Sequence, residues 1–79
     1  MSVLVLSAAA YKLKESYGGG YRAVVMDNRS QERHKSEVFA TVHEARNWAR
    51  KLVEKLMGGQ PWAPGYIYRP DWVMNVWVR

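Results

Sequence analysis

Between residues 42 and 57 the apolar side chains recur at intervals of three and four residues, which is the spacing of one face of a helix. Thr41 stands just before this segment and Glu44 follows three residues later, as in a capping box that binds two otherwise free N–H groups. Gly58 and Gly59 follow, where a helix commonly ends in a left-handed conformation. The pattern predicts a helix over Val42–Met57, with an apolar stripe made of Ala45, Trp48, Ala49, Leu52, Val53 and Leu56.

The rest of the chain alternates between short β-branched or aromatic segments and turn residues, which is typical of strands joined by turns. The first segment is apolar throughout, as in a central strand, and Gly18-Gly19-Gly20 suits a hairpin loop. Pro61 and Pro64 indicate a connector after the helix. We expect five strands: residues 3–6 and onward toward Lys14, residues 21–26, a segment within 33–40, residues 66–69, and residues 73–78.

This order, β-β-β-α-β-β, predicts an α+β fold in which an antiparallel sheet of about five strands carries one helix on one face. A single helix cannot cover both sides of a sheet, so the other face meets either solvent or a partner. Period-2 alternation separates the two faces of the second strand, with Tyr21, Ala23 and Val25 on one side and Arg22, Val24 and Met26 on the other.

Length and composition restrict the protein class. A chain of 79 residues supports one core, so residues 1–79 are expected to form a single domain. It contains no cysteine, which excludes a disulfide scaffold and thiolate chemistry. The N-terminal apolar segment lacks a basic leader and is far shorter than a membrane span. These features favour a cytoplasmic protein without membrane contact.

Residues suited to catalysis are scarce. The two histidines, His34 and His43, stand apart in the sequence, and no cysteine accompanies them, so neither a metal site nor a cofactor is predicted. The glycine triplet precedes a strand and lacks the lysine of a phosphate-binding loop. No nucleophile motif surrounds any serine. We therefore expect a binding protein and not an enzyme.

The aromatic residues gather in the last eighteen positions, and there they flank an arginine. Large rings belong in a small core, but tyrosine, tryptophan and arginine also dominate protein interfaces. The sequence contains four tryptophans and five tyrosines, and they cannot all reach one core. A protein-binding surface is therefore predicted at Trp62, Tyr66, Tyr68, Arg69 and Trp72.

Basic residues outnumber acidic ones, 12 to 7, for a net charge of +5. This balance favours polyanions or acidic protein surfaces, although such a charge also serves solubility alone. The basic group on the helix is typical of a solvated face. The group before the helix is the better candidate for contact with phosphates. The predicted nucleic-acid contacts are Arg22, Arg29, Arg33 and Lys35, with Lys12 or Lys14 as extensions.

The segment from Tyr21 to Leu56 resembles the three-strand-plus-helix DNA-binding modules of the AP2 type, including the arm-binding domains of phage tyrosine integrases. The resemblance rests on Tyr21-Arg22-Ala23-Val24-Val25 and on Phe39-x-Thr41-x-x-Glu44-Ala45-x-x-Trp48. It implies that the sheet enters the major groove of duplex DNA and that Arg22, Arg33 and Lys35 face bases or phosphates. The chain departs from that family by its strands after the helix.

In size and layout the chain is also similar to small phage-encoded host-takeover proteins, including anti-CRISPR proteins. This similarity implies a protein that inhibits or modulates a host or defence complex, which can itself be a nucleoprotein, by occupying its surface. Two hypotheses follow: binding to such a complex through the aromatic residues with help from the basic ones, and binding to duplex DNA through the sheet. Self-association into a homodimer through the open sheet face is compatible with either.

Overall fold

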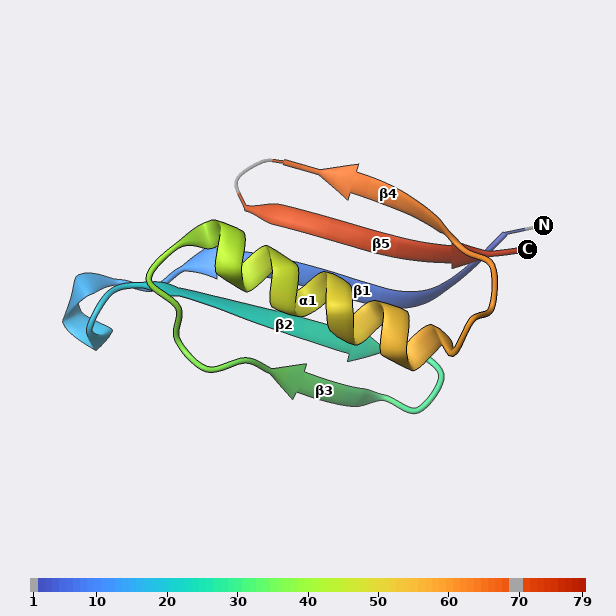
Figure 1. Cartoon of the computed structure of the whole chain (residues 1–79), viewed down its shortest axis with the longest axis horizontal. Coiled ribbons are helices and arrows are strands. Elements are labelled where there is room, and N and C mark those ends of the chain that lie inside the picture. The colour runs from blue at the N-terminus through green and yellow to red at the C-terminus, as the bar shows by residue number, and fades with distance from the viewer. Residues whose placement is uncertain (1, 69–70) are drawn as a thin grey trace.

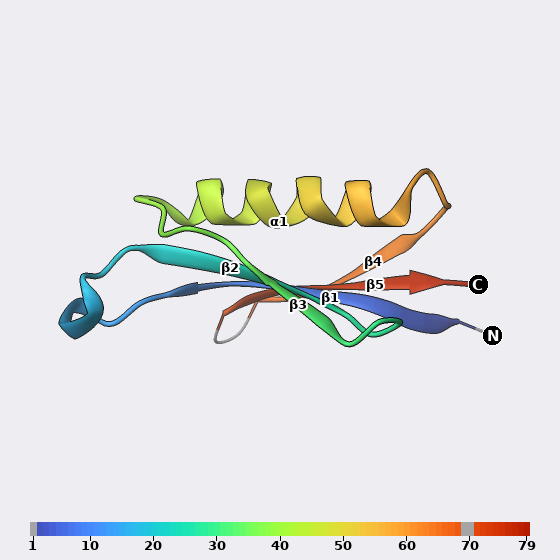
Figure 2. The ribbon, with the colours of Figure 1, turned by 90° about the horizontal axis from the view of Figure 1, so that it is seen from below.

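The computed structural model of this chain describes residues 2–68 and 71–79, and in these residues one helix lies across an antiparallel sheet (Figures 1 and 2). The five strands have the order β3-β2-β1-β5-β4. The predicted α+β class and the order β-β-β-α-β-β are thus confirmed. The elements are β1 (Val3–Lys12), a 3₁₀ turn (Glu15–Tyr17), β2 (Tyr21–Asp27), β3 (Glu32–Lys35), α1 (Val42–Met57), β4 (Ala63–Ile67) and β5 (Trp72–Val78).

Helix α1 has the bounds that its local signals predict. The Thr41 hydroxyl oxygen accepts a hydrogen bond from the backbone N–H of Glu44 at 3.3 Å. The Glu44 carboxylate accepts from the Thr41 hydroxyl at 3.0 Å, and not from the Thr41 backbone N–H as the capping box predicts, so only half of that motif forms. At the other end Gly58 adopts a φ of 59°, and its N–H reaches the Glu54 carbonyl at 3.2 Å.

The core lies between α1 and strands β1, β2 and β5. The helix buries small side chains against the sheet, which lets its backbone approach closely, while Trp48, Leu52 and Leu56 are half-buried along one side of it. The predicted stripe is therefore divided into a fully buried row and one half-buried row beside it. The buried apolar residues are Val5, Leu6, Ala8, Ala10, Ala23, Val25, Ala45, Ala49, Val53, Met57, Trp72, Met74 and Val76.

Strand β3 begins and ends earlier than the segment predicted for it. The Ser36 hydroxyl oxygen accepts a hydrogen bond from the Ala23 N–H at 2.8 Å, so a side chain takes the place of the next backbone acceptor. The chain then returns to β2 at Phe39, whose N–H and carbonyl both bond to Tyr21, at 2.7 and 2.8 Å. The third strand is thus split in two by residues 36–38.

Strand β4 also starts earlier than predicted, and it includes Pro64, which the sequence pattern assigns to a connector. The strand lies at the edge of the sheet, where one side has no partner, so a missing N–H is tolerated. Of the predicted strand 66–69, Arg69 lies outside the described residues. Strand β1 is central, as predicted, and carries an irregularity between Leu4 and Leu6 where it pairs with β5.

Candidate functional site

The face of the sheet opposite α1 is covered by no described element (Figure 2). Its residues follow from strand pairing, because directly paired residues point to the same side of a sheet. On β5, Trp72, Met74 and Val76 are buried, so the residues between them point away from the helix. We call this surface the uncovered face; it consists of Leu4, Ser7, Ala9, Tyr11, Arg22, Val24, Met26, Arg33, Lys35, Ala63, Gly65, Ile67, Val73, Asn75 and Trp77.

The centre of the uncovered face is apolar. Ala9 on β1 pairs with Val24 on one side and with Val73 on the other, and Ile67 continues the same row on β4. In the neighbouring row Met26 lies beside Ser7, whose hydroxyl donates a 3.1 Å hydrogen bond to the Asn75 side-chain oxygen. This bond satisfies polar atoms in the middle of the sheet and leaves the surrounding surface free for apolar contact.

The charges on the uncovered face all have one sign. Arg33 pairs with Met26 and Lys35 with Val24 along edge strand β3, while Arg22 pairs with Tyr11 at one end of the sheet. The acidic residues of the described strands, Asp27 and Glu32, pair with each other on the helix side. The sheet therefore has a cationic margin on its uncovered face, with no carboxylate among the described residues of that face to neutralise it.

Trp77 and Ile67 extend the uncovered face toward the opposite edge of the sheet. Their exposed fractions are 36% and 50%, which is high for large apolar side chains. The indole of Trp77 lies across β4 at Gly65, where an added Cβ would come within 3.1 Å of the indole Nε1. The glycine thus provides the space in which this ring lies over the edge strand.

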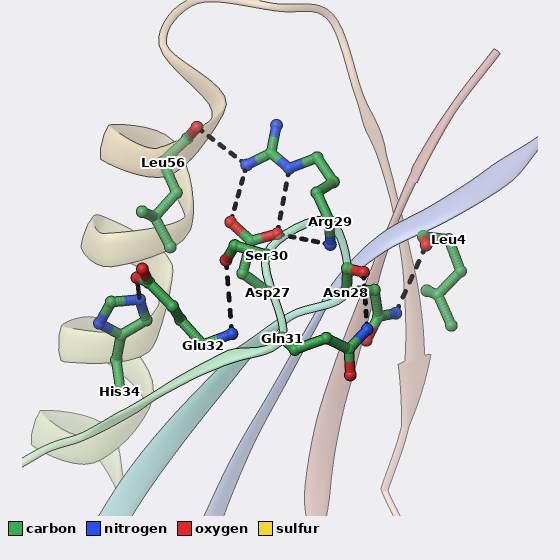
Figure 3. A network of polar contacts seen from close by, with 9 residues as sticks. All are labelled: Leu4, Asp27, Asn28, Arg29, Ser30, Gln31, Glu32, His34 and Leu56. Atoms are coloured by element: carbon green, nitrogen blue, oxygen red, sulfur yellow. Dashed lines mark hydrogen bonds and ion pairs between the residues drawn. The ribbon is translucent and has the colours of Figure 1, made fainter.

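Arg29 does not share a surface with the other predicted basic residues. Its guanidinium donates two hydrogen bonds of 3.1 Å to the carboxylate of Asp27 and a third of 3.3 Å to the Leu56 carbonyl (Figure 3). Hydrogen bonds from the Arg29 side chain hold the pKa of Asp27 below its usual value, and the same contact raises the pKa of Arg29. Arg29 therefore joins the β2–β3 turn to the end of α1 on the helix side.

The predicted aromatic surface is divided among three environments. Trp72 is only 2% exposed and belongs to the core, so its assignment to an exposed binding surface is wrong; alternation along β5 points it at the helix. Tyr66 and Tyr68 are exposed on the helix side, stacked at 5.9 Å between ring centres. Trp62 is half-buried against the core at the other end of β4. Arg69 lies outside the described residues.

A shallow pocket of about 630 Å³ lies beside Trp62, between the segment that follows α1 and the end of β5. Trp77 and Arg79 line it together with Ser2. These residues offer apolar area and one cation but no set of converging polar groups. The pocket borders the uncovered face through Trp77 and forms an extension of that surface.

In the part of the chain that the structure describes, the side chains of His, Asp and Glu do not gather into a group that could hold a metal ion. His34 and Glu32 approach each other at 3.6 Å on β3, and no third group completes a metal-binding set among the described residues. Residues 2–68 and 71–79 contain no helix with the length and apolarity that crossing a membrane requires. The chemistry available at the uncovered face is contact through apolar area and positive charge.

Sequence reasoning missed most of the apolar residues of the uncovered face. The predicted grouping of Val24 and Met26 with Arg22 on one strand is confirmed, and on β5 the residues Val73 and Trp77 lie on the same face. What alternation does not give is the strand order that brings the two groups together across Ala9. That pairing depends on contacts between the first and last strands of the chain.

A search of protein-family models, of curated protein sequences and of solved structures gives no match for this chain.

Proposed function

We propose that this chain is a non-catalytic binding protein that docks its uncovered face on an acidic surface of a protein partner. The observation that carries the proposal is the combination of an apolar centre, at Ala9, Val24 and Val73, with a margin of positive charge and no opposing carboxylate among the face's described residues. Apolar area supplies affinity, and a charged rim supplies orientation and choice of partner.

The role that follows is occupation of a surface on a larger complex. A host or defence-system complex is the class of target that the similarity in size and layout to small phage proteins implies. Within such a complex, a cationic margin suits a protein subunit that presents an acidic surface. Docking inhibits or modulates the complex by excluding its ordinary partner.

Duplex DNA is the second candidate, and one observation favours it. Arg22, Arg33 and Lys35 lie on the sheet face opposite the helix, as the resemblance to AP2-type modules implies for DNA contact. Against it stands the row of Ala9, Val24, Val73 and Ile67, because apolar side chains gain nothing from phosphates and little from the major groove. The basic residues border this row and do not interrupt it.

The test uses a photo-crosslinking amino acid at Met26, within the uncovered face, and the same amino acid at Glu54, which is exposed on α1. A protein captured from Met26 alone is purified, and its Kd for the intact chain is measured. Arg33→Glu with Lys35→Glu is expected to weaken binding by about tenfold or more, because the charge at the rim is reversed. Lys51→Glu with Lys55→Glu makes the same charge change on the helix and should alter the Kd less than about twofold.

Equal weakening by both pairs would show that net charge alone governs the interaction, and it would overturn the proposal. Binding to random duplex DNA is measured in parallel by fluorescence anisotropy. Micromolar or tighter binding that falls steeply with salt and disappears in Arg33→Ala with Lys35→Ala would replace the protein partner by DNA. A dimer in sedimentation that Val24→Asp dissociates would assign the face to a second copy of the chain.

A further inference from the structure

A second group of side chains lies on the helix side of the sheet, away from the uncovered face. We call it the arginine–aromatic cluster; it consists of Arg46, Arg50, Tyr66, Tyr68 and Trp72. The guanidinium carbon of Arg46 lies 5.8 Å from the centre of the Trp72 ring, and that of Arg50 lies 5.2 Å from it. The two arginines are four residues apart on α1, so they occupy one side of the helix and bring two positive charges to one ring.

The buried polar atoms left without partners in this cluster are both donors. Neither arginine has a carboxylate within 4.0 Å among the residues that the structure describes. The Nε of Arg46 and the Nε1 of Trp72 are buried and bond to no acceptor in that part of the chain. Like charges at this helical spacing repel, and buried donors without partners are costly. An acceptor-rich, negatively charged group would relieve the repulsion.

The aromatic rings form a ladder that leads from the core to solvent. Tyr66 lies 6.3 Å from Trp72, and Tyr68 lies 5.9 Å from Tyr66 at an interplanar angle of 20°. Exposure rises along the ladder from 2% at Trp72 to 43% at Tyr66 and 62% at Tyr68. The outer end thus presents aromatic surface on which another flat ring can stack.

We propose that the arginine–aromatic cluster binds single-stranded nucleic acid, with a base stacked on Tyr68 and Tyr66 and the adjoining phosphates at Arg46 and Arg50. A nucleotide carries both features that the cluster is suited to, a flat ring and an anion on a short tether. An acidic peptide satisfies the arginines but leaves the tyrosine ladder unused. A duplex offers phosphates but keeps its bases stacked inside.

This proposal is independent of the function assigned to the uncovered face, since the cluster lies on the opposite side of the sheet. Tyr66 pairs with the buried Met74 on β4 and β5, whereas Arg33 and Lys35 belong to the uncovered face at the β3 edge. Substitutions at one surface therefore leave the other unchanged. The two proposals succeed or fail separately.

The experiment measures fluorescence anisotropy of a labelled twelve-residue oligothymidylate with the intact chain over a range of salt concentrations. Tyr68→Ala is expected to weaken binding roughly tenfold, because one stacking partner is lost, and Tyr68→Phe should retain binding because the ring remains. The slope of log K against log salt is negative, and Arg50→Gln should reduce its magnitude by about 0.7, the value for one phosphate contact on a single strand.

Matched controls separate this site from general attraction to a basic protein. Tyr17→Ala removes an exposed tyrosine from the 3₁₀ turn, and Lys51→Gln removes a charge from another side of α1; neither should change the affinity by more than about twofold. An abasic oligomer of the same length should bind roughly tenfold more weakly than oligothymidylate. Equal affinity for the two oligomers, or equal loss in the control and cluster variants, would overturn the proposal.

Discussion

The guanidinium of Arg29 binds both carboxylate oxygens of Asp27, each at 3.1 Å, and the Arg29 backbone N–H adds a third bond at 2.9 Å. Asp27 is thereby buried as a charged group at the end of β2, with only 7% of its surface exposed. The same guanidinium reaches the Leu56 carbonyl near the end of α1 at 3.3 Å. One ion pair thus connects the β2–β3 turn to the helix C-terminus, where positive charge is favourable.

Asp27→Asn is expected to lower the free energy of unfolding by about 1–3 kcal/mol at neutral pH, because it weakens charge-assisted hydrogen bonds to a buried group. The pKa of Asp27 is lowered in the folded state, chiefly by the Arg29 side chain. The stabilisation is therefore complete above the unfolded pKa of about 3.9 and is lost as the pH falls through the lower, folded pKa. Urea denaturation of both proteins should show a constant difference above about pH 5 that narrows below about pH 4.

Glu32→Gln is the matched control, since Glu32 is an exposed carboxylate at the start of the next strand. It should change stability by less than about 0.5 kcal/mol. If the difference in unfolding free energy between wild type and Asp27→Asn stayed unchanged from pH 7 down to pH 3, Asp27 would not be stabilising the fold as a buried charged group.

Val25 and Val24 are neighbours on β2 that face opposite sides of the sheet. Val25 is fully buried under α1, whereas Val24 is half-buried on the uncovered face. Val25→Ala removes two methyl groups from the core and should cost about 2 kcal/mol, while Val24→Ala should cost less than about 1 kcal/mol. Urea denaturation gives both values, and equal costs would mean that the uncovered face is buried in solution.

Gly20 and Gly19 share a left-handed backbone but differ in their surroundings. A Cβ at Gly20 would lie 2.6 Å from Val38 Cγ1 and 2.9 Å from the Phe39 carbonyl oxygen, whereas a Cβ at Gly19 meets nothing within 4 Å. Gly19→Ala should cost about 1 kcal/mol for the backbone conformation alone. Gly20→Ala should lower the stability by more than this, because the Phe39 carbonyl must move and it accepts the hydrogen bond from the Tyr21 N–H on β2. Thermal denaturation of the two variants compares them directly.

The Ser36 hydroxyl accepts from Ala23 N–H at 2.8 Å and donates to the Glu37 carbonyl at 2.7 Å. Ser36→Ala leaves the Ala23 N–H buried without an acceptor and should cost about 1–3 kcal/mol. Ser30→Ala, at an exposed turn, should change stability by no more than about 0.5 kcal/mol. Amide hydrogen exchange should also quicken at Ala23 in Ser36→Ala, and unchanged protection there would argue against this role.

Local signals sufficed for the helix. Thr41 and Gly58 mark its two ends by side-chain and backbone chemistry that depends on a few adjacent residues, so both bounds could be predicted. The edges of the strands depend on neighbours distant in sequence. Pro64 is accepted in β4 because that strand lies at the edge of the sheet, and β3 ends where the Ser36 side chain replaces a backbone acceptor. Neither fact is visible in a short window of sequence.

In the candidate surfaces, too, the features set within one strand could be predicted, and those set by pairing between distant strands could not. Alternation along β2 correctly groups Arg22 with Val24, since one strand determines it. The aromatic residues near the C-terminus lie on β4, on β5 and on the segments before and between these strands. Whether two of them share a face depends on the register of the strands. Tyr66 pairs with Met74, so it points to the helix side, while Trp77 points to the uncovered face. Proximity in sequence therefore suggested one surface where the structure has several.

The central position of β1 has a consequence for how the chain folds. One edge of β1 pairs with β2, and the other edge pairs with β5, the last described strand. Because Val3 pairs with Val78, this second pairing joins residues that are 75 positions apart in the sequence. Such distant pairings carry a large entropy cost before any stabilisation is gained, and they slow folding. During synthesis the β1–β2 hairpin and α1 can form early. The unsatisfied edge of β1 stays open until β5 leaves the ribosome, which makes that interval the period of greatest exposure to wrong strand pairing.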